Sequence, residues 1–181
     1  VAHRLLSIAE KKGFNQLRVS GGEPTIGRKH LLQLLDELAL NRGYKFILET
    51  NGILIGSDSS YAKDLSRYQF LHVRVSLKGC NEAEFMRLTG AKPEGFNLQL
   101  KALQSMIEAG VKCHPAVMVS FSTEESYRDL IERLRRIELS LAKDVEIEEL
   151  ILYEHVAERL RRHGLQYRNS HQPCNVPQRL I

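Results

Sequence analysis

Segments typical of buried β-strands alternate with amphipathic helical segments along almost the whole of this chain. The expected strands span residues 14–20, 44–50, 70–77, 111–121 and 146–153. The expected helices span residues 1–12, 28–41, 60–66, 97–109, 123–141 and 154–163. Strands that alternate with helices in this way are joined by right-handed crossovers and lie parallel. The pattern therefore predicts an α/β fold with a parallel sheet whose strands all end at one edge.

The number of repeats limits the architecture further. Five expected strands are too few for a closed eight-stranded barrel, so residues 1–165 are expected to form an open, partial (β/α) barrel. The first helix has no N-cap residue and no initiating methionine before it, which suggests that at least one strand is missing at the front. Residues 166–181 contain two prolines and little periodicity, and they are expected to be a C-terminal extension.

Composition excludes several classes of protein. The chain has 181 residues, of which 43% are hydrophobic and 27% charged, as expected for a folded globular domain. There is no apolar run as long as a membrane span and no visible signal peptide. The net charge of +4 comes without a long basic block, so a nucleic-acid partner is possible but not favoured.

The cysteines indicate a reducing environment. Cys80, Cys113 and Cys174 are odd in number and far apart in the sequence. This spacing argues against a local metal knuckle and against a disulfide framework. We therefore expect a cytoplasmic protein.

The sequence Gly21-Gly22-Glu23-Pro24 directly follows the first expected strand. Two adjacent glycines allow the backbone to come very close to a ligand, the glutamate adds an acceptor, and the proline fixes the turn. By itself, this segment also fits an ordinary strand-to-helix turn. The ends of the other strands are needed to decide between these interpretations.

Polar residues also occur at or near the other strand ends. The candidates are Glu49 and Asn51 for the second strand, Ser76 and Lys78 for the third, His114 in the fourth, and His155 for the fifth. Because parallel strands end at one edge, these residues are expected to gather around one rim. Structural alternatives remain open: an ion pair between Glu49 and Lys78, an ordinary Asn51 turn, a core hydroxyl at Ser76, and simple packing of His114.

This ordered set of motifs resembles the radical S-adenosylmethionine (SAM) superfamily over about residues 14–153. Within it, the chain is most similar to the glycyl-radical activating enzymes of the pyruvate formate-lyase type and to related archaeal and bacterial proteins. The matching segments are Gly21 to Pro24, Glu49 to Gly52, Leu77-Lys78, Arg87 to Gly90, Ala109 to Val111 and Glu149 to Tyr153.

The resemblance implies an enzyme that, in its intact form, reductively cleaves SAM at a [4Fe–4S] cluster to give a hydrogen-abstracting 5′-deoxyadenosyl radical. It implies an electron donor of the flavodoxin or ferredoxin type and a protein or small-molecule substrate. The residues that it assigns to SAM, by the part of the cofactor that each contacts, are Gly21, Gly22, Glu23 and Pro24 for the ammonium, Ser76 and Lys78 for the carboxylate, Glu49 and Asn51 for the ribose, and Val117 and Val119 for the adenine. The expected substrate contacts at the rim are His114, Tyr153 and His155.

Two departures from the family pattern limit this interpretation. The family holds its cluster with a C-x3-C-x2-C loop, and no such loop is present. We therefore expect no metal ligands in this chain, cluster ligands upstream of it, and no activity from the chain by itself. Ser76 also stands where activating enzymes often have an acidic residue, and Cys174 is a weak candidate for an auxiliary cluster.

Three other functions stay open. A non-catalytic module of the same fold could bind SAM or a nucleotide at the same rim. A radical SAM protein that modifies tRNA would suit the mildly basic charge. An unrelated partial-barrel enzyme of phosphate chemistry ranks lowest, because no glycine-rich loop has the usual phosphate-binding spacing.

Overall fold

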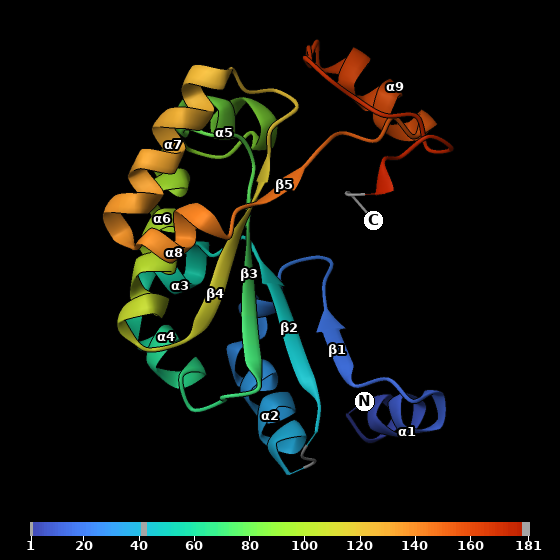
Figure 1. The fold of residues 1–181 in the computed structure, drawn as a ribbon, viewed down its shortest axis with the longest axis vertical. Coiled ribbons are helices and arrows are strands. Elements are labelled where there is room, and N and C mark those ends of the chain that lie inside the picture. Colours follow the sequence, from blue (N-terminus) through green and yellow to red (C-terminus); the bar gives the residue numbers. More distant parts are fainter. Residues whose placement is uncertain (1, 41–42, 179–181) are drawn as a thin grey trace. The chain divides into compact units, whose positions relative to one another are not determined.

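The computed structural model describes residues 2–40 and 43–178. In this part of the chain, five strands form a parallel sheet in the order β1-β2-β3-β4-β5 (Figure 1). The strands are β1 (Gln16–Val19), β2 (Lys45–Thr50), β3 (Leu71–Leu77), β4 (Lys112–Met118) and β5 (Glu146–Glu148). The predicted α/β fold with a parallel sheet is therefore confirmed.

The helices follow the predicted alternation, with more breaks than expected. They are α1 (Ala2–Lys12), α2 (Arg28–Ala39), α3 (Ile53–Ser57), α4 (Ser59–Leu65), α5 (Glu82–Thr89), α6 (Glu94–Glu108), α7 (Glu124–Ile137), α8 (Leu139–Lys143) and α9 (Glu154–Arg162), with the 3-10 turn η1 (Pro24–Gly27) before α2. None of the helices within residues 2–40 and 43–178 has both the length and the apolar character needed to cross a bilayer.

Two differences from the expected elements have local causes. The single helix expected over 123–141 is interrupted because Glu138 takes an extended conformation, with φ −163° and ψ 137°. Helix α5 was not expected, although Asn81 accepts from the Glu84 N–H at its start and Gly90 ends it in the left-handed conformation. These are ordinary helix start and stop signals, so the sequence contained this information.

The chain forms two compact units. Unit 1 consists of Val1–Val75 and Leu98–His114, and unit 2 of Ser76–Asn97 and Pro115–Ile181. In unit 1, the register of β1 and β2 pairs Leu17 with Phe46, and β2 alternates buried and half-buried residues. This alternation directs one row of its side chains to the core and the other row to the opposite face.

Close backbone packing holds unit 1 together on its helical side. Gly56 of α3 lies against α6, and a Cβ atom there would be 1.9 Å from the Leu98 carbonyl oxygen. Leu35, Phe46, Leu48 and other large side chains are fully buried. Burial of such side chains supplies the main stabilisation of a unit of this size.

Unit 2 has its own apolar cores. Phe85 and Phe96 pack with their ring centroids 6.3 Å apart, and a further cluster forms around Phe121, Leu150 and Leu160. The fifth strand is shorter than expected. Part of the expected C-terminal extension pairs with the residues that follow this strand. Ile151 and His171 form an isolated parallel bridge, so part of residues 166–178 is held by backbone hydrogen bonds.

Candidate functional site

The glycine turn of unit 1 has an open backbone. Gly21 and Gly22 have φ angles of 86° and 57°, in the left-handed region that glycine tolerates best. A Cβ atom at either position would have no atom within 4 Å. The glycines are therefore required by the backbone conformation, and the space beside them is available to a ligand. Pro24 then begins η1, as a proline in a first turn can.

The Glu23 carboxylate is engaged within the protein. Its Oε1 atom accepts from Thr25 N (3.1 Å), Thr25 Oγ1 (2.5 Å) and Thr50 Oγ1 (2.6 Å), and its Oε2 atom accepts from Asn51 N (2.7 Å). A carboxylate offers about four acceptor positions, so most of its capacity is used. The side chain ties the turn after β1 to the loop after β2, and we call this arrangement the Glu23 clamp.

The loop after β2 is fixed from several sides. The Asn51 side-chain oxygen accepts from Ile53 N (2.9 Å), and the Asn51 carbonyl accepts from Gln99 Nε2 (2.7 Å). Gly52 follows with φ 76°, and its N–H donates to Thr50 Oγ1 (3.0 Å). The predicted ribose ligand Asn51 therefore lies directly beside the glycine turn, in a well-defined conformation.

Glu49 has cationic partners in unit 1 that sequence reasoning missed. Arg18 of β1 forms an ion pair with its carboxylate, and Arg74 of β3 lies 3.8 Å from it. Arg74 is only 8% exposed. The signal was available, because Arg18 and Arg74 each interrupt an apolar strand and so belong to the row opposite the core.

His114 lies in the first half of β4, four residues before its last residue, Met118. Its Nδ1 atom is 2.6 Å from Nε2 of His72 on β3, a hydrogen bond in which one ring donates and the other accepts. The side chain therefore does more than pack the strand. Its expected contact with a substrate at the carboxyl edge stays a prediction.

In unit 2, Ser76 is the penultimate residue of β3 and Lys78 directly follows the strand. The Lys78 ammonium donates to Glu148 Oε2 of β5 at 3.0 Å. Lys78 and Glu49 thus each have an ion-pair partner in their own unit. Because 42% of the Lys78 side chain is exposed, its pair is weak and leaves the ammonium accessible to another anion.

The two valines predicted to contact adenine differ in exposure. Val117 is fully buried and pairs with Ile147 of β5, so it has no exposed surface for a ligand. Val119 is half-buried, and its N–H donates to the Glu148 carbonyl at 3.0 Å. Both assignments stay predictions. Of the two residues, only Val119 has side-chain surface that a ligand could contact.

Tyr153 and His155 lie at the start of α9 with their rings stacked, 5.9 Å apart between centroids and 16° from parallel. Tyr153 is 47% exposed. A stacked, exposed pair of this kind offers a flat surface to a ligand. The predicted role of both residues in substrate contact is compatible with this exposure and stays a prediction.

Glu84 is a second engaged carboxylate, and sequence reasoning missed it. Its Oε2 atom accepts from Cys80 N (2.7 Å) and Ser122 Oγ (2.5 Å), and its Oε1 atom accepts from Asn81 Nδ2 (3.2 Å). Glu84 is buried, with 9% exposure. It ties the loop after β3 to the segment after β4 within unit 2, and we call this arrangement the Glu84 clamp.

Across residues 2–40 and 43–178, no three His, Cys, Asp or Glu side chains are grouped so that they could hold a metal ion. Burial raises the pKa of the Cys80 thiol to about 11 and that of Cys113 to about 12. High thiol pKa values disfavour the thiolate that ligates iron. Cys174 is exposed. The described residues therefore do not build a [4Fe–4S] site.

Comparison with known proteins gives a family. Residues 1–134 match the model of the Radical SAM superfamily. A GTP 3′,8-cyclase of Helicobacter pylori (strain HPAG1) is 30% identical over 139 residues, which cover 74% of this chain and 41% of that protein. A GTP 3′,8-cyclase of Saccharophagus degradans is 33% identical over 118 residues, covering 63% and 34%. The chain thus spans less than half the length of these relatives.

Solved structures share the fold. Streptococcus suis SuiB bound to its precursor peptide SuiA superposes with a TM-score of 0.67 at 19% identity, covering 93% of this chain and 40% of that one. Native anSMEcpe with bound AdoMet gives a TM-score of 0.65 at 19% identity, covering 82% and 42%. Identities this low bear on the fold only, and they agree with the predicted partial (β/α) barrel.

Proposed function

Because the chain belongs to the radical SAM superfamily, we propose that it is the SAM-binding core of a radical SAM enzyme. The observation that carries the proposal is the Gly21-Gly22 turn, with its left-handed backbone and the open space beside it. An open backbone at the end of a parallel strand is a usual place for a ligand. We assign this turn to the methionine end of SAM.

The turn suits the chemistry of that end of the cofactor. The SAM ammonium needs hydrogen-bond acceptors, and backbone carbonyl oxygens beside two glycines can approach it without steric hindrance. The four hydrogen bonds accepted by Glu23 make it a positioning residue first and an ammonium acceptor second. In the superfamily, SAM bound at an iron–sulfur cluster supplies a 5′-deoxyadenosyl radical that abstracts hydrogen.

The remaining cofactor contacts are proposed from the strand ends. Asn51 is preferred over Glu49 for the ribose hydroxyls, because Glu49 already has Arg18 and Arg74 as partners. Ser76 and Lys78 are assigned to the SAM carboxylate. The half-buried Val119 is assigned to the adenine in preference to the fully buried Val117.

Under this proposal, the chain binds SAM but does not provide the ligands of the cluster. The described residues provide no metal site, so the cluster ligands are assigned to sequence outside this chain. An electron donor of the flavodoxin or ferredoxin type is proposed as the partner of the whole enzyme, because reductive cleavage of SAM requires one electron.

The substrate class is a finer proposal. The motifs suggested glycyl-radical activation, with a protein glycine as substrate. The curated relatives described above are named GTP 3′,8-cyclases, which favours a nucleotide. We prefer a nucleotide over a protein glycine for this reason, and rank a tRNA substrate below both.

Binding of SAM to this chain tests the cofactor site directly. Equilibrium dialysis with radiolabelled SAM is expected to show saturable binding. Gly22→Ala should weaken it at least about tenfold, because the methyl group enters the ligand space and the left-handed conformation costs about 1–2 kcal/mol. Gly110→Ala is the matched control, since Gly110 has φ 75° and is equally open. Equal losses in both variants would contradict the assignment.

The reaction is tested with the complete gene product. After anaerobic reconstitution with iron and sulfide, we expect an oxygen-sensitive chromophore and, with reductant, 5′-deoxyadenosine. A folded product that binds SAM but forms no cluster would instead support the second candidate, a non-catalytic SAM-binding module. The observation that favours this second candidate is that the described residues provide no metal site.

A further inference from the structure

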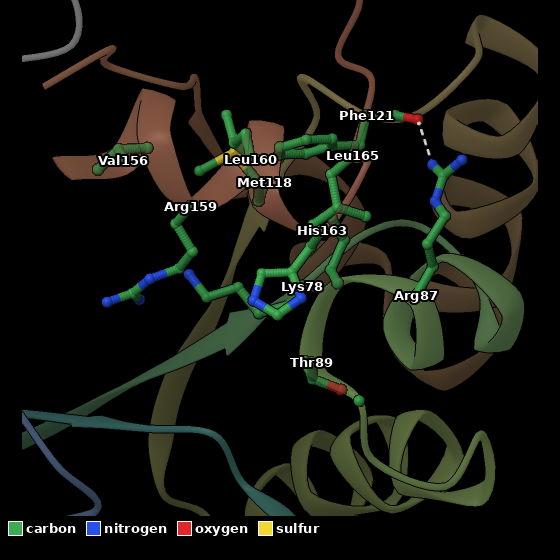
Figure 2. Close-up of a pocket in the computed structure, with 12 residues that line it drawn as sticks. Lys78, Arg87, Thr89, Met118, Phe121, Val156, Arg159, Leu160, His163 and Leu165 are labelled. Atoms are coloured by element: carbon green, nitrogen blue, oxygen red, sulfur yellow. Dashed lines mark hydrogen bonds between the residues drawn. The ribbon is translucent and has the colours of Figure 1, made fainter. Parts of the chain in front are cut away.

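Unit 2 contains a cavity of about 860 Å³. This volume lies within the range of about 300–1,000 Å³ usual for small-molecule sites. The cavity is lined from the end of β3, from α5, from the end of β4 and the residues after it, and from α9 and the turn that follows it (Figure 2). Except for Lys78, none of its residues is used by the cofactor contacts proposed above.

One part of the lining is an apolar wall. Its members are Leu88, Met118, Phe121, Val156, Leu160 and Leu165. All six belong to, or pack against, the buried cluster around Phe121, Leu150 and Leu160. The wall is therefore supported by a packed core behind it, and it offers a preformed apolar surface to the body of a ligand.

The polar part of the lining is cationic. Lys78, Arg87, Arg159 and His163 line the cavity together with Thr89 and Gly90, and no Asp or Glu is among its described lining residues. Thr89 Oγ1 already donates to the Phe85 carbonyl and accepts from Ala91 N. The cationic side chains are therefore the polar groups that dominate the recognition of a ligand.

Two of the cations have partners that reduce the available charge. Lys78 donates to Glu148 at 3.0 Å. Arg87 donates through Nη2 to the Phe121 carbonyl at 3.2 Å, as the dashed line in Figure 2 marks; this uses one of its five N–H donors. Lys78 and Arg159, which lie on the same side of the cavity in Figure 2 and away from Arg87, are the cations that can meet one anion.

We propose that this cavity binds a phosphorylated small molecule with an apolar ring system. The ring lies against the apolar wall, and the phosphate lies beside Lys78 and Arg159, while Arg87 stays bound to the Phe121 carbonyl. A phosphate dianion is attracted to these two cations more strongly than a carboxylate monoanion is, and arginine presents several donors to phosphate oxygens at once. Lys78 is shared with the proposed SAM carboxylate contact, so the location is tested at Arg159, which the proposed function does not use.

The ligand class is tested by calorimetric titration of this chain with 1-naphthyl phosphate, 1-naphthoate and 1-naphthalenemethanol. The three probes share one ring and differ in charge. We expect the phosphate to bind at least about tenfold more tightly than the other two, because near neutral pH it carries almost two negative charges, whereas the carboxylate carries one and the alcohol none. If naphthoate bound equally well, the assignment to a phosphate would be wrong. Absence of phosphate binding would overturn the site altogether.

The location is tested with two charge reversals on the same helix. Arg159→Glu places a negative charge in the cavity and should weaken 1-naphthyl phosphate binding at least about tenfold. Arg162→Glu changes the net charge equally, but Arg162 lies outside the cavity lining and pairs with Glu158 at 3.1 Å. We expect it to weaken binding less than about threefold because of solvent screening. Equal effects would overturn the location.

A second measurement locates the site without any variant, in case a variant fails to fold. Amide chemical shifts of the unmodified chain, followed by NMR during titration with 1-naphthyl phosphate, should change at Gly90, Phe121 and Leu165. These residues line the cavity on three different segments. Shift changes confined to residues outside the cavity, such as Gly21 and Gly22, would overturn the proposal.

Discussion

Each unit contains a glutamate clamp that holds two loops together, and the two clamps differ in what they leave open. Glu23 in unit 1 accepts hydrogen bonds from Thr25, Thr50 and Asn51. Glu84 in unit 2 accepts from Cys80 and Ser122, and also from Asn81. Both carboxylates join segments that follow different strands. The same local chemistry therefore stabilises both sets of loops.

The neighbouring glycines show the difference. Gly79 has φ 96°, and a Cβ atom there would lie 2.6 Å from Cβ of Glu84. Gly21 and Gly22 have positive φ as well, but nothing lies within 4 Å of the corresponding positions. The Glu84 clamp fills the space beside its glycine, whereas the Glu23 clamp leaves that space open. A ligand can therefore reach the backbone in unit 1, while unit 2 offers side chains around a cavity.

Removal of a clamp is expected to have the largest effect. In Glu23→Ala, the donors at Thr50 and Asn51 lose a charged acceptor, and hydrogen bonds of this kind contribute about 1.5–3 kcal/mol each, with incomplete additivity. We expect the free energy of unfolding to fall by about 3 kcal/mol in urea titrations, and SAM retention to be lost in dialysis of the folded fraction. Glu10→Ala, at an exposed position of α1, is the control. If folded Glu23→Ala bound SAM normally, the Glu23 clamp would have no role in the cofactor site.

The glycines should give intermediate and unequal effects. In Gly79→Ala, the new Cβ atom collides with Glu84 in addition to the backbone strain, so we expect a loss of about 2–3 kcal/mol in the free energy of unfolding. In Gly21→Ala, strain acts without a collision, and about 1–2 kcal/mol is expected. SAM binding should show the reverse order, with the larger loss in Gly21→Ala. Equal stability losses would mean that Glu84 moves aside at little cost.

The sequence was sufficient for the sheet and for the glycine turn, because both depend on local patterns. Strand and helix periodicity predicted the parallel sheet, and the glycine pair after a strand predicted an open turn. The Glu84 clamp could not be predicted in this way, since Ser122 is 38 residues away from Glu84. The partners of Glu49 also depend on pairing between β1, β2 and β3. Such contacts arise from tertiary packing, which single-sequence periodicity does not encode.

The apolar cavity of unit 2 was missed for a related reason. Arg159 and His163 belong to a basic helix end, a pattern typical of a solvated helix face. Their proposed role depends on the cavity that they share with Lys78, which follows β3, and with Arg87 of α5, both far away in the chain. By contrast, helix α5 has a start signal at Asn81 and a stop signal at Gly90, so it was predictable from local sequence.

The smallest effect concerns the two buried thiols, since none of the proposed contacts uses them. Cys113 in unit 1 and Cys80 in unit 2 have pKa values raised to about 12 and about 11, chiefly by burial. Between the ordinary thiol pKa of about 8.5 and these values, the unfolded chain loses protons that the folded protein keeps. Stability is therefore fully present below about pH 8.5 and falls as the pH rises above it, which urea titrations across this range can follow.

The labelling rates of the same thiols show how readily each unit opens locally. At pH 8, the exposed Cys174 should react with a thiol reagent within minutes, and Cys80 and Cys113 only as fast as their surroundings open. Because Cys80 N donates to Glu84, Glu84→Ala should accelerate labelling of Cys80 and leave Cys113 nearly unchanged, as read by mass spectrometry of peptides. Equal acceleration at both thiols would show that the units open together, so that the Glu84 clamp stabilises the whole chain and not its own loops.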